Sequence, residues 1–105
     1  MSALRFAYLL LGPGYSAQTQ RADFESAAMQ AALYGVGSVD EACALARTLA
    51  ENGVQCIELC GAFGEAGAER IIAATGGEVA VGYSVHLLRQ DALFDRLFGP
   101  SDDHT

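Results

Sequence analysis

The residue best placed to do chemistry is a carboxylate inside an apolar segment. Glu58 lies within residues 54–60, Val-Gln-Cys-Ile-Glu-Leu-Cys, whose apolar and β-branched residues predict a strand. A carboxylate among apolar neighbours must be paired, hydrogen-bonded or protonated, and burial raises its pKa toward values that suit proton transfer. Glu58 is therefore a candidate general acid or base. The alternative is a glutamate on the exposed face of an edge strand, or one bound to the adjacent glycine-rich turn.

Two further side chains could act together with Glu58. His86 directly follows residues 79–85, another predicted strand, and histidine titrates near neutral pH. Cys60 lies two residues after Glu58, on the same strand face, before a predicted helix whose dipole would lower a thiol pKa. Glu58 and His86 would form an acid–base pair, and Cys60 with His86 a nucleophile and its base. The alternatives are a capping histidine and a small buried cysteine.

The ends of the predicted strands supply the residues that would line a ligand site. In an open parallel sheet, ligands bind beyond the carboxyl ends of the strands. Three of the four ends here are glycine-rich, which allows close approach of a ligand to the backbone. For the first of these turns, Gly12-Pro13-Gly14, the alternative is a plain turn without a ligand. The expected ligand-binding residues are Gly12, Tyr15, Gly61, Phe63, Gly64, Tyr83 and Ser84.

The glycine-rich segments match no common cofactor motif. Gly61-Ala62-Phe63-Gly64 is followed by Glu65 and lacks the Lys-Ser/Thr pair of a phosphate loop, and no G-x-G-x-x-G follows the first strand. Cys56 and Cys60 have no second pair of cysteines or histidines at zinc spacing. The sequence therefore predicts no metal and no cofactor.

Alternating strands and helices carry these side chains. Strands are predicted at residues 4–11, 31–36, 54–60 and 79–85, and helices at 38–52, 66–75 and 88–98. Ser38 and Glu41 form a capping box at the start of the first helix. The alternation predicts one α/β domain with a four-stranded, largely parallel sheet built from βαβ units. A helix is predicted somewhere within residues 21–29, with a loop or a short extra strand around residues 23–26 as the alternative.

The amino-acid composition argues against several classes of protein. Hydrophobic residues make up 51% of the 105 residues and charged residues 18%, which argues against disorder. The net charge is −7 without a Lys/Arg cluster, so we expect no nucleic-acid partner, and no apolar segment is long enough to span a membrane. Three cysteines without a signal peptide predict a cytoplasmic protein without disulfides. Residues 100–105 are predicted to be a mobile acidic tail.

Three stretches together resemble a family of small bacterial proteins of unknown function and about this length. They are Ile57 to Gly64 (I-E-L-C-G-A-F-G), the helix start Ser38-Val39-Asp40-Glu41-Ala42, and Val81-Gly82-Tyr83-Ser84-Val85-His86. The resemblance runs from the first strand to the final helix, and the E-L-C-G-x-F-G stretch is its most specific part. It implies a small α/β fold and assigns no activity.

The expected function is that of a small cytoplasmic metabolic enzyme acting on a small organic molecule by general acid–base chemistry, as a lyase, isomerase, cyclase or hydrolase. The alternative is a non-catalytic small-molecule-binding or assembly domain. An enzyme requires Glu58 and His86 to converge on one pocket, whereas an assembly domain would bury them in a subunit contact. The apolar final helix, with Leu93, Phe94 and Leu97, and the two unprotected sheet edges predict a homodimer or higher homo-oligomer.

Overall fold

The computed structural model describes residues 3–99 as a mixed α/β fold with five strands. The predicted class is confirmed, but the predicted number of strands is wrong. The predicted tail at residues 100–105 lies outside the described part of the chain. In chain order the elements are β1 (Leu4–Leu11), β2 (Arg21–Glu25), β3 (Met29–Val36), α1 (Val39–Glu51), β4 (Cys56–Leu59), η1 (Gly61–Phe63), α2 (Gly64–Ala74), β5 (Ala80–Tyr83), η2 (Leu88–Gln90) and α3 (Asp91–Phe98).

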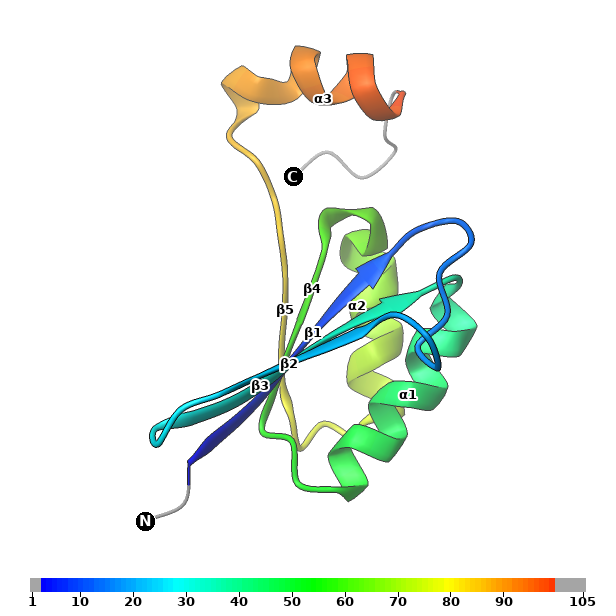
Figure 1. The fold of residues 1–105 in the computed structure, drawn as a ribbon. Helices are drawn as coiled ribbons and strands as arrows, with labels where there is room; N and C mark the ends of the chain where they lie inside the picture. Colours follow the sequence, from blue (N-terminus) through cyan, green and yellow to red (C-terminus); the bar gives the residue numbers. More distant parts are fainter. Residues whose placement is uncertain (1–2, 100–105) are drawn as a thin grey trace.

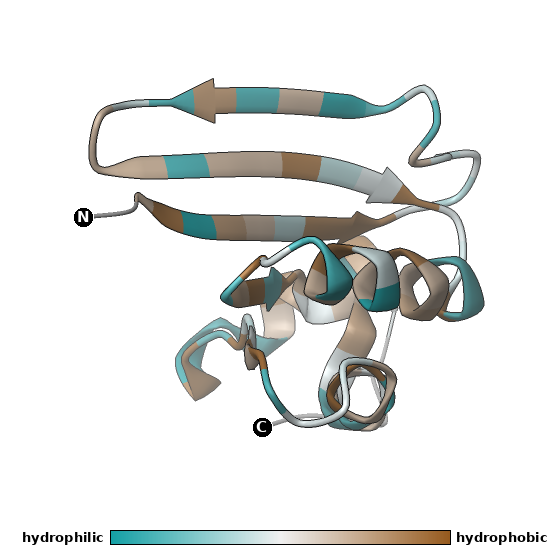
Figure 2. Ribbon diagram, turned by 90° about the horizontal axis from the view of Figure 1, so that it is seen from below, coloured by the Kyte–Doolittle hydropathy of each residue, from teal (hydrophilic) through white to brown (hydrophobic). Residues whose placement is uncertain are grey.

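The sheet has the strand order β2-β3-β1-β4-β5. β1, β3, β4 and β5 are parallel, as the βαβ pattern predicts, and β2 pairs antiparallel with β3. The helix predicted within residues 21–29 is wrong, and the alternative of an extra strand is the structure observed. Charged residues alternate with apolar ones along β2 (Figure 2), and this period of two suits a strand paired along one edge.

Both long helices lie on the same face of the sheet (Figure 1). The connection from β3 through α1 to β4 and the one from β4 through α2 to β5 move across the sheet in the same direction. Right-handed crossovers that move in one direction place their helices on one face. The core lies between this face and the helices, and its largest fully buried side chains are Leu9, Val36, Ile57, Leu59 and Ile71.

The opposite face of the sheet carries no helix of the described chain, and we call it the open face (Figure 1). Strand register and alternation assign its residues, because paired residues in neighbouring strands point to the same side. The open face is formed by Leu4, Phe6, Tyr8, Leu10, Ala22, Phe24, Met29, Ala31, Leu33, Gly35, Cys56, Glu58, Ala80 and Gly82. It is apolar except for Glu58 and the Tyr8 hydroxyl.

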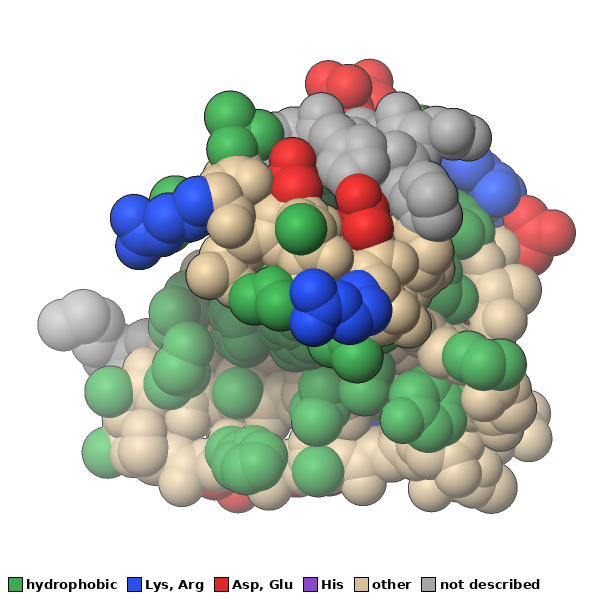
Figure 3. Space-filling view, turned by 90° about the horizontal axis from the view of Figure 1, so that it is seen from above, with side chains coloured by type: hydrophobic (Ala, Val, Ile, Leu, Met, Phe, Trp, Pro, Cys, Tyr) green, Lys and Arg blue, Asp and Glu red, His purple; other side chains and the backbone are tan. Residues whose placement is uncertain are grey.

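Beyond β5 the chain leaves the sheet and forms a projection, residues 85–98, which we call the arm (Figure 1). None of the residues of α3 is buried. Seen from above, hydrophobic side chains gather on the body of the molecule beneath the arm (Figure 3). The radius of gyration is 14.2 Å, compared with about 13 Å for a compact domain of this length. The arm accounts for this elongated shape.

Candidate functional site

Glu58 lies in the middle of the open face. The strand register places it between Tyr8 of β1 and Gly82 of β5. Its carboxylate lies over Gly82, since a Cβ atom at that position would be 2.8 Å from Glu58 Oε2 and 3.0 Å from Oε1. Within residues 3–99 no hydrogen bond or ion pair reaches this carboxylate. The half-buried carboxylate can therefore accept hydrogen bonds or a proton from a group outside the chain.

Two thiols lie near Glu58 and have different surroundings. Burial, and to a smaller degree the charge of Glu58, raises the pKa of Cys56. The Sγ atom of Cys60 accepts a hydrogen bond of 3.2 Å from the backbone N–H of Leu11, across the ends of β1 and β4. Cys60 also packs against the hydrophobic core. These contacts give Cys60 a structural role at the end of the sheet. All three cysteines of the chain are free thiols.

His86 belongs to the arm and is held there by residues of α3. Its Nε2 atom lies 2.5 Å from Asp91 Oδ1, and its ring stacks on Phe94 with centroids 4.0 Å apart. Among the described residues, no hydrogen bond or ion pair joins His86 to Glu58. The structure therefore does not assemble the expected acid–base pair within one chain, nor the pairing of Cys60 with His86.

The rim formed by β1 and β3 is filled by the protein itself. A Cβ atom at Gly12 would lie 2.7 Å from the ring of Tyr15, and one at Gly35 would lie 3.1 Å from the same ring. Gly12 and Tyr15, both expected to bind a ligand, are thus brought together. The close approach at Gly12 is that of a tyrosine side chain, which matches the alternative of a turn without a ligand.

The remaining expected residues are divided between two places. Gly61 and Ser84 lie side by side beyond β4 and β5, where a Cβ atom at Gly61 would be 3.2 Å from the Ser84 carbonyl oxygen. Phe63 is buried in the core against Gly67, and Tyr83 also packs on the core. Gly64 has φ of +63°, a backbone conformation that residues with a side chain rarely adopt. A glycine is therefore favoured at this position, where the chain enters α2.

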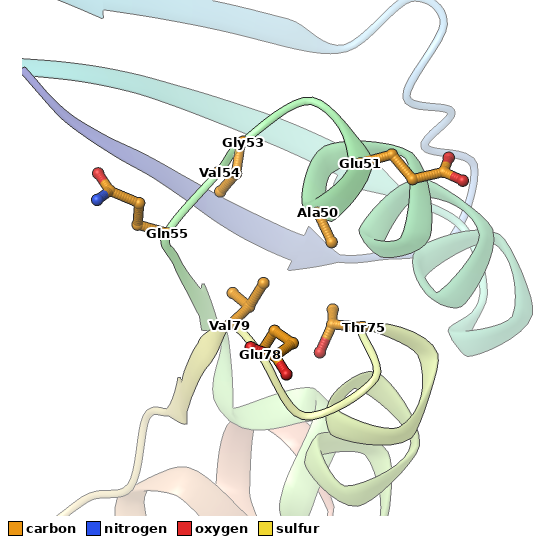
Figure 4. Close-up of a pocket in the computed structure, with 8 residues that line it drawn as sticks. All are labelled: Ala50, Glu51, Gly53, Val54, Gln55, Thr75, Glu78 and Val79. Carbon is orange, nitrogen blue, oxygen red and sulfur yellow. The ribbon is translucent and has the colours of Figure 1, made fainter. Parts of the chain in front are cut away.

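Two hollows lie away from the expected rim. One, of about 500 Å³, opens at the amino ends of β4 and β5 beside the last turns of α1 and α2. In Figure 4 the side chains of Glu51 and Gln55 point away from the other labelled residues. The Gln55 Oε1 atom accepts a hydrogen bond from the Arg5 backbone N–H. This hollow therefore offers few convergent polar groups to a ligand.

The second hollow, of about 400 Å³, lies between β2, β3, β1 and the end of α1. Two of its charged groups are paired with each other: Arg21 binds both oxygens of Asp23 and lies 5.0 Å from the centroid of the Tyr34 ring. Arg5 Nη1 donates to the Asn52 carbonyl oxygen. The sequence interpretation missed this cluster because a helix was predicted within residues 21–29. The strict alternation Arg21-Ala22-Asp23-Phe24-Glu25 was the signal that could have revealed it.

Comparison with known proteins places the chain in a family. The model of a family of unknown function, DUF6506, matches residues 4–99. The chain belongs to this family. The match of the DUF6506 domain includes Glu58, Cys60 and His86, and it confirms the predicted resemblance to a family of unknown function. No curated protein and no solved structure matches the chain.

Among residues 3–99 no group of three or more His, Cys, Asp or Glu side chains is placed to hold a metal ion. No helix of the described part is long and apolar enough to cross a bilayer.

Proposed function

We propose that the chain binds a small organic molecule on the open face and that Glu58 is its general acid–base group. The observation that carries this proposal is the Glu58 carboxylate, which lies over Gly82 among apolar side chains and accepts no hydrogen bond from residues 3–99. An acceptor-only carboxylate selects a ligand that carries a cation or an N–H or O–H donor. With such a molecule bound, Glu58 could remove a proton from it.

Apolar surroundings support the choice of ligand class. Tyr8 flanks Glu58 on one side, and Cys56 shares its face two residues away. A binding site lined by apolar groups with a few polar ones is typical for small organic molecules. His86, bound by Asp91 within the arm, is not part of this proposal for a single chain.

The proposal is tested with the Glu58→Gln variant. The probes are small amines, guanidines, imidazoles and hydroxy acids, screened by thermal shift and then titrated by calorimetry. A compound that binds the wild type should bind Glu58→Gln about 10- to 100-fold more weakly, because a charge-assisted hydrogen bond is lost. Turnover of such a compound, where it occurs, should also be lost.

Gly82→Ala serves as a second variant because it keeps the carboxylate but moves it. The added methyl group would lie 2.8 Å from Glu58 Oε2, so the flexible end of Glu58 must shift. We expect weaker binding of the same compound with an unchanged fold by circular dichroism. Glu65→Gln, on the first turn of α2, is the matched control and should bind normally. Full affinity or full turnover in Glu58→Gln would contradict the proposal.

A second candidate function is a non-catalytic assembly domain. It is favoured by the position of His86, which binds Asp91 and Phe94 in the arm instead of facing Glu58. In that case Glu58 would meet a cation of another subunit. The two candidates are distinguished by the Glu58→Gln variant: loss of ligand binding with intact assembly supports the first, and loss of assembly without any ligand effect supports the second.

A further inference from the structure

Two apolar surfaces of the described chain have no cover, and the first is the open face. β1 reads Leu-Arg-Phe-Ala-Tyr-Leu-Leu-Leu, and such a nearly continuous apolar run is typical of a strand covered on both sides. The chain covers only one side, because both crossovers place their helices on the same face. Phe24, on β2, remains 60% exposed.

The second uncovered surface is the arm. Leu93, Phe94, Leu97 and Phe98 form one stripe along α3 and are 47%, 40%, 77% and 77% exposed. The arm is internally ordered, because His86 binds Asp91 and the rings of His86, Phe94 and Phe98 form a continuous stack. An ordered helix with an exposed apolar stripe is ready to dock without a large loss of conformational entropy.

The chain exposes more surface than a compact monomer of its mass. The accessible surface of the chain is 6715 Å², whereas a compact monomer of 11.0 kDa exposes about 5,600 Å². The difference, about 1,100 Å² over all 105 residues, leaves room for an interface, which buries roughly 800 Å² on each partner.

The open face and the arm carry charged groups of opposite sign. Glu58 is the only charged side chain among the described residues of the open face. The arm carries Arg89 before its apolar stripe and Arg96 within the same helix, and both are exposed. The same helix carries Asp91, which binds His86, and Asp95, so the two arginines are the groups of the arm whose charge is opposite to that of Glu58.

A second copy of the chain can cover both the open face and the apolar stripe of the arm. The arm extends beyond the end of its own sheet, and no residue of its helix α3 is buried (Figure 1). A two-fold axis lets each arm meet the other copy's face, so that one contact is made twice. We propose that two copies of the chain exchange arms, each packing its α3 stripe on the open face of the other.

This arrangement completes the surroundings of Glu58. The partner's arm would lie on the apolar residues around Glu58 and exclude water from that part of the face, while the carboxylate stays open to a ligand. Arm exchange thus gives the site of the proposed function a wall that one chain lacks. Its own support is the pair of uncovered surfaces, and it holds whether or not Glu58 binds a small molecule.

The first test is the mass in solution, measured by light scattering at micromolar concentration. The full chain should have twice the 11.0 kDa of one copy. Leu97→Asp and Phe98→Asp change side chains that are exposed in one copy, so the fold should survive, while the dimer dissociation constant rises by at least about thirtyfold. Ile72→Asp, at a 37% exposed apolar position on α2, is the matched control and should stay dimeric.

The second test locates the contact. A bismaleimide cross-linker is applied to Leu97→Cys, mixed from ¹⁴N- and ¹⁵N-labelled copies, and the products are mapped by mass spectrometry. The introduced thiol should be joined to Cys56 or Cys60 of the other copy, whereas Ile72→Cys should not give these products.

Two results would overturn arm exchange. One is a wild-type monomer at micromolar concentration, which would leave the surfaces for a membrane or another protein. The other is a dimer whose mass is unchanged in Leu97→Asp and Phe98→Asp and whose cross-links do not join the arm to the open face. Neither result depends on ligand binding by Glu58, so the two proposals fail separately.

Discussion

At the scale of single residues, sequence alternation located the central carboxylate but not its histidine partner. A strand period of two puts Cys56 and Glu58 on one face, and the structure has them there. His86 follows β5 by three residues, and its position depends on Asp91 and Phe94, two side chains of a helix that forms later in the chain. These contacts of His86 depend on tertiary packing. Its position at the end of a strand could therefore not predict them.

The pKa of the Cys56 thiol depends in part on the charge of Glu58. Burial and the neighbouring carboxylate raise the pKa of this thiol. Replacing the charge in Glu58→Gln should lower the pKa of Cys56, so the fraction of thiolate at a given pH below that pKa should rise. We therefore expect faster alkylation of Cys56 by iodoacetamide, measured by peptide mass spectrometry over pH 7–9. Cys43, on α1, is the internal control and should react at an unchanged rate.

A rate for Cys56 that stays the same in Glu58→Gln would place the carboxylate away from the thiol. It would also remove the basis for a charged Glu58 on the open face.

At the scale of elements, local signals predicted α1 well and β2 poorly. The Ser38 hydroxyl accepts from the Glu41 N–H, as the capping box predicts, and α1 begins at Val39. β2 exists because it pairs with β3, and short polar strands of this kind carry little intrinsic preference. The apolar residues of positions 24–32 are spaced as in a helix, so the pairing partner outweighed the local pattern.

The strand ends show the same dependence on partners. β5 was predicted over residues 79–85 and spans Ala80–Tyr83. It pairs with β4, which itself ends at Leu59, and the Ser84 N–H makes the last bond to the Leu59 carbonyl oxygen. Apolar residues after Ser84 belong to the arm. A hydrophobic pattern alone cannot distinguish a buried strand from a segment that packs against another surface.

Glu41 joins α1 to the loop after β1. Its Oε1 atom accepts from the Gly37 N–H at 2.7 Å and Oε2 from the Ala17 N–H at 3.0 Å, and these bonds lower the pKa of Glu41. Glu41→Gln can accept through one oxygen only, so it should reduce the free energy of unfolding by about 1 kcal/mol at pH 7. Urea unfolding measures this loss, and Glu69→Gln, at an exposed position on α2, is the control.

The lowered pKa of Glu41 determines how its contribution to the free energy of unfolding changes with pH. Because the folded-state pKa of Glu41 is lowered, its contribution is fully present above the ordinary glutamate pKa of about 4.3 and is lost as the pH falls through the folded-state value. The difference between wild type and Glu41→Gln should therefore shrink under acidic conditions. A difference that is constant from pH 7 to pH 3 would show that ionised Glu41 does not hold these two N–H groups.

At the scale of the whole molecule, the topology leaves one face of the sheet without a helix of the described chain. Parallel strands with apolar residues on both sides predict a two-sided cover, and the sequence supplies three helices for it. Two of them lie on one face, and the third, α3, stands beyond the sheet (Figure 1). Composition could predict an oligomer, but only the strand order and the position of α3 indicate which surfaces would meet.

A dimer held by exchanged arms should unfold at a temperature that depends on protein concentration. Association stabilises the folded state by mass action, so the midpoint of thermal unfolding should rise as the chain is concentrated from about 1 to 100 μM. Leu97→Asp should remove most of this dependence and lower the midpoint at high concentration. Ile72→Asp should keep the wild-type dependence, because Ile72 lies on α2, away from the arm. Differential scanning calorimetry measures all three. A wild-type midpoint that is independent of concentration, together with a midpoint for Leu97→Asp equal to that of the wild type, would mean that the arm contributes nothing to the stability of the assembled molecule.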